Sequence, residues 1–168
     1  MATKKSIWVL FGILVISAWV LGSVIQAGAE TMNYKFYTYA FKYESAPAGD
    51  VEGHTLGLSI RKGFYVFENG EVATVNTVSS SDLVKWSGPF IQYVTINFAD
   101  GSTIIIKNQG TLGGKASDRT GEIIKGTGRF EGIKGTQSAK AKYLPVEKGE
   151  VEPKGYGEGT ITYTLPSK

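Results

Sequence analysis

The feature that most constrains the fold of this chain is a succession of alternating apolar and polar segments separated by turn signals. Asn69-Gly70 separates two such segments, and residues 99–102, which read Ala-Asp-Gly-Ser, separate another two. Turns of this composition join neighbouring antiparallel strands, because Asn, Asp and Gly tolerate the positive φ angles of tight hairpins. The sequence has no strand–helix–strand period and no internal repeat. It therefore predicts an all-β domain with an antiparallel sheet.

Most of the chain after residue 29 is predicted to form strands. The segments with strand patterns are residues 32–43, 54–60, 63–68, 71–79, 90–98, 103–110, 122–128, 136–144 and 157–165. Residues 79–89 form the exception, since Ser81 or Asp82 can cap one helical turn that ends at Gly88-Pro89. Residues 111–121 are predicted to be the longest loop.

About eight meandering strands have two ways to bury their apolar faces, either as two packed sheets or as one closed sheet. Closure removes the exposed edges that promote aggregation, so we predict an eight-stranded antiparallel closed β-barrel rather than a sandwich. The wall of such a barrel encloses enough room for packed side chains or for one small ligand.

The N-terminus has the pattern of an export signal. Lys4 and Lys5 precede an apolar run over residues 7–25, and Ala27-Gly28-Ala29 places small residues where a signal peptidase cleaves. We expect a signal peptide over residues 1–29, cleavage after Ala29, a secreted or periplasmic location and a single barrel domain over residues 30–168. The alternative is an uncleaved membrane anchor, since nineteen mostly apolar residues can cross a bilayer as a helix. After cleavage, no membrane attachment is expected.

Composition excludes several classes of function. Lys4 and Lys5 are the only charged residues of the predicted signal peptide, so the remaining chain carries 16 basic and 15 acidic residues. This near-neutral balance argues against a nucleic-acid partner. Cysteine is absent, which excludes disulfides, thiolate metal sites and thiol nucleophiles. The single histidine, His54, cannot by itself supply the ligand set of a zinc site, so no metal is expected.

The segment GTGRFEGIKG, residues 126–135, resembles a phosphate-binding loop only in its glycine content. Glu131 occupies the position of the third glycine of the dinucleotide motif, and no helical pattern follows. A Walker-type loop is also missing, so no nucleotide cofactor is expected. We interpret the segment as a structural corner in which glycines permit the backbone path and an aromatic residue joins the core. The residues of this corner are Gly126, Gly128, Phe130, Gly132 and Gly135.

Two groups of side chains are candidates for ligand binding. Tyr37 and Tyr39 share one face of the first predicted strand, and Tyr93 and Asn97 share a mixed face of residues 90–98 that suits a cavity with specificity groups. Glu52 and His54 flank the start of the second strand and are predicted to form a polar pair beside the cavity. The alternative interpretations are ordinary core packing for the aromatic residues and a solvated rim for the charged pair. The candidates are therefore Tyr37, Tyr39, Glu52, His54, Tyr93 and Asn97.

Residues 98–111, 121–135 and 157–165 together resemble the allene oxide cyclase-like barrel superfamily, which includes the plant dirigent proteins. Those proteins carry a similar Gly-Ser-Thr strand entry and a similar Gly-Thr-Gly-x-Phe-x-Gly corner. The resemblance covers residues 33–166, and it implies an eight-stranded barrel with a ligand cavity at one mouth and Phe130 at the barrel floor. It also implies an assembly of identical subunits, a dimer or a trimer. The cyclase carboxylate motif and the dirigent acid and arginine set do not map onto this chain, so catalytic residues stay unassigned.

Three functions are compatible with these features. The first is an exported barrel that binds a small apolar or aromatic molecule in its lumen. The second is a cyclase or isomerase that shapes a reactive substrate in the cavity, and the third is a structural, oligomer-forming envelope protein. A cavity of several hundred cubic ångströms would favour the first two, since ligand pockets begin at about 300 Å³. A buried carboxylate or histidine in that cavity would favour the cyclase.

Overall fold

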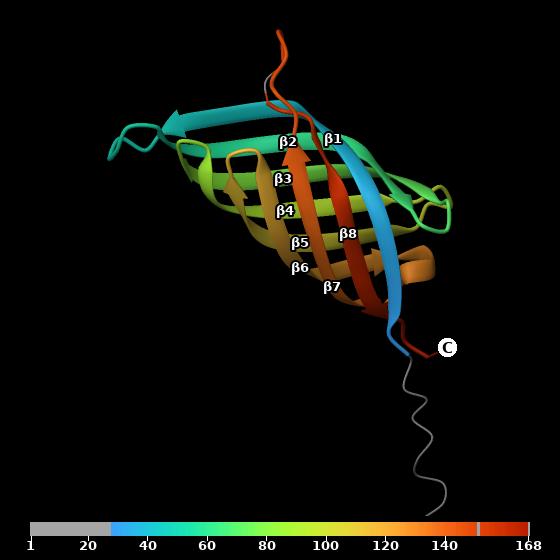
Figure 1. Ribbon diagram of the computed structural model, residues 1–168. Helices are drawn as coiled ribbons and strands as arrows, with labels where there is room; N and C mark the ends of the chain where they lie inside the picture. The colour runs from blue at the N-terminus through green and yellow to red at the C-terminus, as the bar shows by residue number, and fades with distance from the viewer. Residues whose placement is uncertain (1–27, 151, 168) are drawn as a thin grey trace, which may run out of the picture.

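The computed structural model describes residues 28–150 and 152–167, and it is a closed antiparallel barrel of eight strands (Figure 1). Each strand pairs with its neighbour in the sequence, and the barrel closes where β8 pairs with β1. The predicted barrel is thereby confirmed. The strands are β1 (Glu30–Pro47), β2 (His54–Phe67), β3 (Val72–Val84), β4 (Ser87–Asn97), β5 (Thr103–Gly113), β6 (Ala116–Thr127), β7 (Lys134–Tyr143) and β8 (Gly155–Thr164).

The predicted signal peptide and the alternative anchor fall almost entirely on residues 1–27, which lie outside the described residues. Within residues 28–150 and 152–167, no helix has the length and apolarity needed to cross a bilayer.

The predicted helical turn within residues 79–89 is wrong. β3 continues to Val84 and β4 begins at Ser87, so Lys85 and Trp86 form a two-residue hairpin turn. Both turn residues have positive φ, 50° for Lys85 and 63° for Trp86. A capping residue stabilises one isolated helical turn only slightly, whereas β3 is stabilised along its length by pairing with both neighbouring strands.

Two further boundaries differ from the prediction. The basic pair Arg61-Lys62 does not divide the second strand, because β2 runs unbroken and these two residues point to opposite sides of the sheet, Arg61 inward and Lys62 outward. The predicted loop over residues 111–121 is a hairpin whose strands, β5 and β6, end and begin at Gly113 and Ala116. Polar residues are frequent in these segments, so the hydrophobicity pattern did not predict that they form strands.

The hairpins predicted at Asn69-Gly70 and Asp100-Gly101 are confirmed, but their turns are not of type I′. Among the non-glycine residues described, only Lys85 and Trp86 have positive φ. In each of these two turns the glycine is therefore the one residue in the left-handed region, with φ of 85° for Gly70 and 83° for Gly101. The N–H of each glycine donates to the carbonyl three residues earlier, at 2.9 Å and 3.1 Å. This pattern is a type I turn followed by a glycine bulge, which is the usual three-residue hairpin.

The two ends of the barrel are built differently. The end that we call the floor carries the β2–β3 and β4–β5 turns, the short 3-10 helix η1 (Gly128–Phe130) and both ends of the described chain. The other end, the mouth, carries the β1–β2, β3–β4 and β5–β6 turns and, between β7 and β8, residues 144–150 and 152–154, which we call the mouth loop. In Figure 1 the mouth loop projects at the top, whereas the end of β8 lies at the lower right.

An apolar core fills the floor half of the lumen. Its members are Tyr34, Phe36, Tyr65, Phe67, Ala73, Val75, Val94, Ile96, Phe98, Ile104, Ile106, Ile123, Phe130, Ile133, Ala139, Ala141, Ile161 and Tyr163. Aromatic rings stack across this core, with Tyr34 and Tyr65 4.2 Å apart and nearly parallel. Such packed rings are worth roughly 0.5–1.5 kcal/mol beyond the area they bury.

The glycine segment 126–135 turns the chain at the floor. Gly128 and Gly132 have positive φ, 62° and 75°. The other two glycines are needed for space, because a Cβ on Gly126 would lie 2.1 Å from the Phe130 carbonyl oxygen and a Cβ on Gly135 would lie 2.1 Å from the Thr162 carbonyl oxygen. Phe130 is buried in the aromatic cluster of the floor.

Candidate functional site

The inward face of the barrel changes from apolar to polar between the floor and the mouth. On β4, the inward residues are Ile96, Val94 and then Gln92, and on β5, Ile106 is followed by Asn108. β1, β2, β3 and β6 make the same change, whereas β7 has its buried Gln137 nearer the floor than Ala139 and Ala141. The buried polar residues of the zone toward the mouth are Thr38, Ser59, Arg61, Thr77, Gln92, Asn108, Ser117 and Arg119.

Two small cavities lie within this polar zone. The mouth cavity has a volume of about 80 Å³, and the lower cavity has a volume of about 20 Å³. Arg61, Gln92 and Tyr143 line both, so the lower cavity lies directly beneath the mouth cavity. Both volumes are well below the roughly 300 Å³ of an ordinary ligand pocket. The lumen is therefore nearly filled by its own side chains.

The mouth loop closes the mouth cavity with an acidic side chain. The Arg61 Nη1 donates to Glu152 Oε2 at 2.9 Å, and the Ser59 hydroxyl donates to the same oxygen at 2.5 Å. The Arg61 Nη2 donates to the Pro153 carbonyl, also at 2.5 Å. Both side chains of the ion pair are nearly buried, with 10% of Arg61 and 12% of Glu152 exposed.

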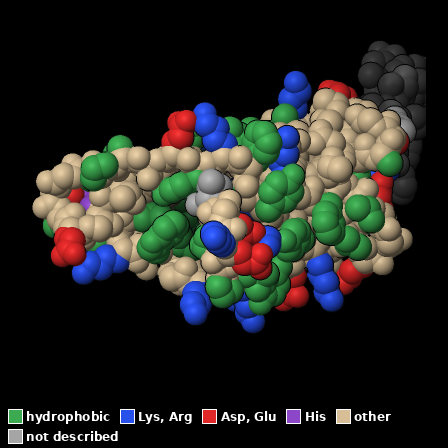
Figure 2. All heavy atoms as spheres, turned by 90° about the horizontal axis from the view of Figure 1, so that it is seen from above, with side chains coloured by type: hydrophobic (Ala, Val, Ile, Leu, Met, Phe, Trp, Pro, Cys, Tyr) green, Lys and Arg blue, Asp and Glu red, His purple; other side chains and the backbone are tan. Residues whose placement is uncertain are grey.

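The same loop is exposed on its outer side. Lys154 pairs there with Glu147 at 3.2 Å and with Glu150 at 2.7 Å. Figure 2 looks down on the side from which the loop projects, and acidic and basic side chains gather near the middle of that view with hydrophobic side chains on either side.

Arg119 is a second buried guanidinium, and no carboxylate neutralises it. It is 7% exposed, it lines the lower cavity, and it belongs to none of the ion pairs found among the described residues. Its guanidinium carbon lies 4.7 Å from the centre of the Phe36 ring. Burial raises the pKa of the neighbouring Tyr34 hydroxyl well above its usual range, so this phenol is neutral and supplies no counter-charge.

Several polar atoms of this zone have no hydrogen-bond partner. Around the lower cavity these are Thr77 Oγ1, Gln92 Oε1 and Arg119 Nε, and farther along the wall both side-chain polar atoms of Asn108 are unpaired. A buried polar atom without a partner costs roughly 1–3 kcal/mol. These unpaired atoms thus lower the stability of the folded barrel.

Four of the six predicted ligand residues lie on the outer surface of the barrel and not in the lumen. Tyr39 and Tyr93 are each 44% exposed. The inward residues of β4 are those of the more apolar face, so the prediction that its mixed face lines the cavity was wrong. Burial of the more apolar face is the larger gain in free energy. The four outward residues are Tyr37, Tyr39, Tyr93 and Asn97.

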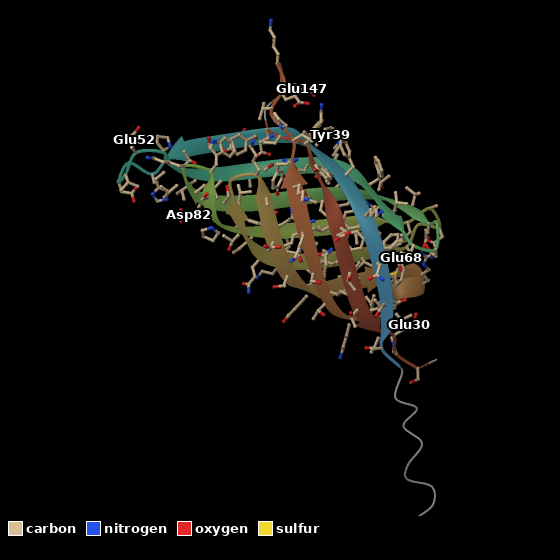
Figure 3. All side chains as sticks on the ribbon, viewed as in Figure 1. Glu30, Tyr39, Glu52, Glu68, Asp82 and Glu147 are labelled. Carbon is tan, nitrogen blue, oxygen red and sulfur yellow. The ribbon has the colours of Figure 1, made fainter. Side chains whose placement is uncertain are left out.

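The other two predicted residues, Glu52 and His54, lie at the β1–β2 loop and line neither cavity. His54 does not pair with Glu52. Its Nδ1 lies 2.6 Å from Asp50 Oδ1, and its Nε2 lies 2.6 Å from an oxygen of Asp82 at the end of β3. Figure 3 shows Glu52 and Asp82 at the same end of the molecule. In place of the predicted pair, His54 bridges Asp50 of the β1–β2 loop and Asp82 of β3.

The residues that do surround the cavities were missed for identifiable reasons. Arg61 has the same inward parity as Tyr65 and Phe67 on β2, and that parity was a usable signal. Arg119 lies in the segment that was predicted to be a loop. Glu152 reaches the mouth from a loop, where no periodic pattern predicts side-chain direction.

Comparison with known proteins agrees with the fold. The structure resembles that of the pterocarpan synthase dirigent protein GePTS1, with 13% sequence identity, a TM-score of 0.51, and coverage of 86% of this chain and 94% of that chain. It also resembles a protein of unknown function of the DUF3224 family from Shewanella oneidensis MR-1, with 16% identity, a TM-score of 0.51, and coverage of 84% and 100%. No family model and no curated protein matches the chain. The barrel is thus dirigent-like, and at these identities the likeness concerns the fold.

Proposed function

We propose that this protein is an exported dirigent-like barrel that binds a small molecule with an aromatic or apolar body at the mouth of its lumen. The observation that carries the proposal is the composition of the mouth cavity. Its apolar walls come from Leu83, Trp86, Phe90 and Leu112, and its polar groups include Arg61 and Gln92. Apolar walls with a few converging polar groups are typical of ligand sites.

The volume of the mouth cavity limits the ligand. About 80 Å³ is less than most ligands need, but Glu152 and Pro153 of the mouth loop line this same cavity and occupy part of the mouth. The ligand therefore either is very small or takes the place of these two residues. A single substituted aromatic ring is the size class that fits the second case.

The buried polar zone supports a binding function over a purely structural one. A barrel that serves only as a scaffold gains stability from an apolar lumen, because buried unpaired polar groups and an unneutralised guanidinium both cost free energy. Groups of this kind concentrate at functional sites. The cyclase alternative has less support, because Glu152, the one carboxylate among the described residues that line the two cavities, is engaged by Arg61.

Trp86 provides a direct test, because it lines the mouth cavity and the chain has only two other tryptophans, Trp8 and Trp19. In the full-length chain carrying Trp8→Phe and Trp19→Phe, we expect phenol, benzamide or benzoate to change the Trp86 fluorescence saturably, with matching heats in calorimetry. Ser79→Phe, which fills the mouth cavity, is expected to weaken this binding at least tenfold. Ser80→Phe is the matched control, since Ser80 lies on the outer face of the same strand.

The proposal fails if no compound binds, or if Ser79→Phe and Ser80→Phe weaken binding equally.

A self-associating structural protein is the second candidate, and the outer surface of β2–β4 favours it. Leu56, Leu58, Val78, Ile91 and Tyr93 are exposed there, and the pairing register places Leu58, Ser80 and Ile91 side by side across three strands. Exposed apolar patches of this kind mark interaction surfaces. Native mass spectrometry distinguishes the candidates, because a dimer or trimer without retained small molecules favours the structural one.

A further inference from the structure

The strongest unexplained contact of the molecule is the one between Glu152 and the lumen. A loop carboxylate normally stays in water, because burial of a charge costs several kcal/mol before its partner compensates. Here the Glu152 carboxylate is nearly buried, and it accepts hydrogen bonds from Arg61 and Ser59 at the rim of the polar zone. Both donors belong to β2. The barrel wall therefore provides a formed binding site for a carboxylate, and the chain itself fills it.

The charge of the lumen exceeds what Glu152 neutralises. Within residues 28–150 and 152–167, two guanidinium groups line the cavities, those of Arg61 and Arg119, whereas Glu152 is the one carboxylate that does so. Arg119 lies deeper, with its Nε unpaired and nine-tenths of the residue buried. An anion that entered past Arg61 would approach this second cation.

The donor geometry selects a planar anion. Arg61 presents Nη1 to Glu152 and Nη2 to the carbonyl of Pro153, so both outer nitrogens are held by the mouth loop. If these two residues withdraw, both N–H groups become available on one edge of the guanidinium. That arrangement matches the two oxygens of a carboxylate.

We propose that the mouth binds a small aromatic carboxylate, and that Glu152 is an internal occupant which this ligand displaces from Arg61. This inference rests on the proposed function, because it names the ligand class of the same site. The ring of the ligand contacts the apolar wall of Leu83, Trp86 and Leu112. Its carboxylate replaces the Glu152 carboxylate on Arg61 and Ser59.

The test compares benzoate with benzamide, its neutral counterpart, on the full-length chain with Trp8→Phe and Trp19→Phe. Glu152→Gln removes the competing charge while it keeps the side-chain shape. We expect this variant to bind benzoate at least tenfold more tightly than the parent does, with benzamide affinity unchanged within a factor of two. Arg61→Gln in the Glu152→Gln background is expected to abolish the preference for benzoate.

Glu150→Gln is the matched control, since Glu150 lies on the same loop, pairs with Lys154 and does not line the mouth cavity. It is expected to leave both affinities unchanged. Equal gains for benzoate and benzamide, or an equal gain with Glu150→Gln, would overturn the displacement mechanism and leave the proposed function standing. Absence of benzoate and benzamide binding to every variant would overturn this inference, and absence of phenol binding as well would overturn the proposed function. Circular dichroism of each variant verifies that the barrel is folded.

Discussion

The imidazole of His54 lies between two carboxylates, and its titration makes the stability of the β1–β2 loop depend on pH. The hydrogen bonds that the imidazole donates to Asp82 and, to a smaller extent, to Asp50 raise the pKa of His54 above its ordinary value of 6.5. A group whose pKa is raised by folding stabilises the folded state fully below its unfolded pKa, and that contribution is lost as the pH rises through the folded pKa. The loop is therefore held most firmly under mildly acidic conditions.

We predict that the free energy of unfolding falls as the pH rises from about 6.5 through the folded pKa of His54. Denaturant unfolding between pH 5 and 9 measures it, and His54→Gln is expected to flatten the profile in this window. Because His54 is the only histidine, its NMR titration reports the folded pKa without ambiguity. A midpoint at or below the ordinary histidine value would refute this prediction.

The buried polar residues of the lumen lower the stability of the fold, which indicates a role in function. Arg119 has no carboxylate partner, and Asn108 and Gln92 have unpaired atoms. Each such group destabilises the folded barrel, so it is retained for something other than stability. The proposed anionic ligand would supply the missing counter-charge and acceptors.

At the scale of elements, the β3–β4 hairpin is the most strained connection described. A two-residue turn with both φ angles positive favours Asn-Gly, whereas Lys85 and Trp86 occupy it here. A side chain in the left-handed region costs roughly 1–2 kcal/mol per residue. Trp86 has a compensating contact, because its ring stacks on Tyr43 with centres 6.3 Å apart, and it also lines the mouth cavity.

We predict that Lys85→Asn raises the free energy of unfolding by about 0.5–1 kcal/mol, because Asn adopts positive φ more readily while Trp86 keeps its contacts. Urea unfolding of the variant beside the parent chain measures the change. Lys142→Asn is the matched control, since Lys142 is an exposed residue within β7, where Asn offers no such advantage. A stability equal to that of the parent would show that the turn is not under strain.

At the scale of the whole molecule, the barrel closes along a seam of glycines. β8 lies between β7 and β1 (Figure 1), and its inward positions nearest the mouth are Gly155, Gly157 and Gly159. A Cβ on Gly159 would lie 2.3 Å from the Tyr34 hydroxyl oxygen. Gly157 and Gly159 thus leave room for the aromatic rings of β1 in this part of the lumen.

We predict that Gly157→Ala lowers the free energy of unfolding by about 1–3 kcal/mol, the usual cost of overpacking. The added Cβ would lie 2.0 Å from the Lys140 carbonyl oxygen and 2.9 Å from the Phe36 ring, so strand pairing and core would both have to shift. Gly113→Ala is the control, since no heavy atom lies within 4 Å of its Cβ and its effect is expected to stay within about 0.5 kcal/mol. Thermal and urea unfolding compare the two, and equal stabilities would count against a tightly packed seam.

The strand order and the closed barrel could be predicted because they follow from local signals. Turn residues such as Gly70 and Gly101 set the hairpin succession, and a meander of about eight strands leaves two free edges that closure removes. The alternation along β4 likewise indicated two faces, one more apolar than the other. It did not by itself place Tyr93 outside the barrel.

The sequence alone determined that this chain forms hairpins, that these make one antiparallel wall, and that Phe130 lies in a glycine-rich corner. Tertiary structure alone decided which residues meet inside the lumen. Arg61, Arg119 and Glu152 come from two strands and a loop separated by up to 91 positions in the chain, and they converge only when β8 pairs with β1. The sequence pattern along one strand indicates whether a side chain can be buried. The residues that it contacts depend on how the whole sheet curves and closes.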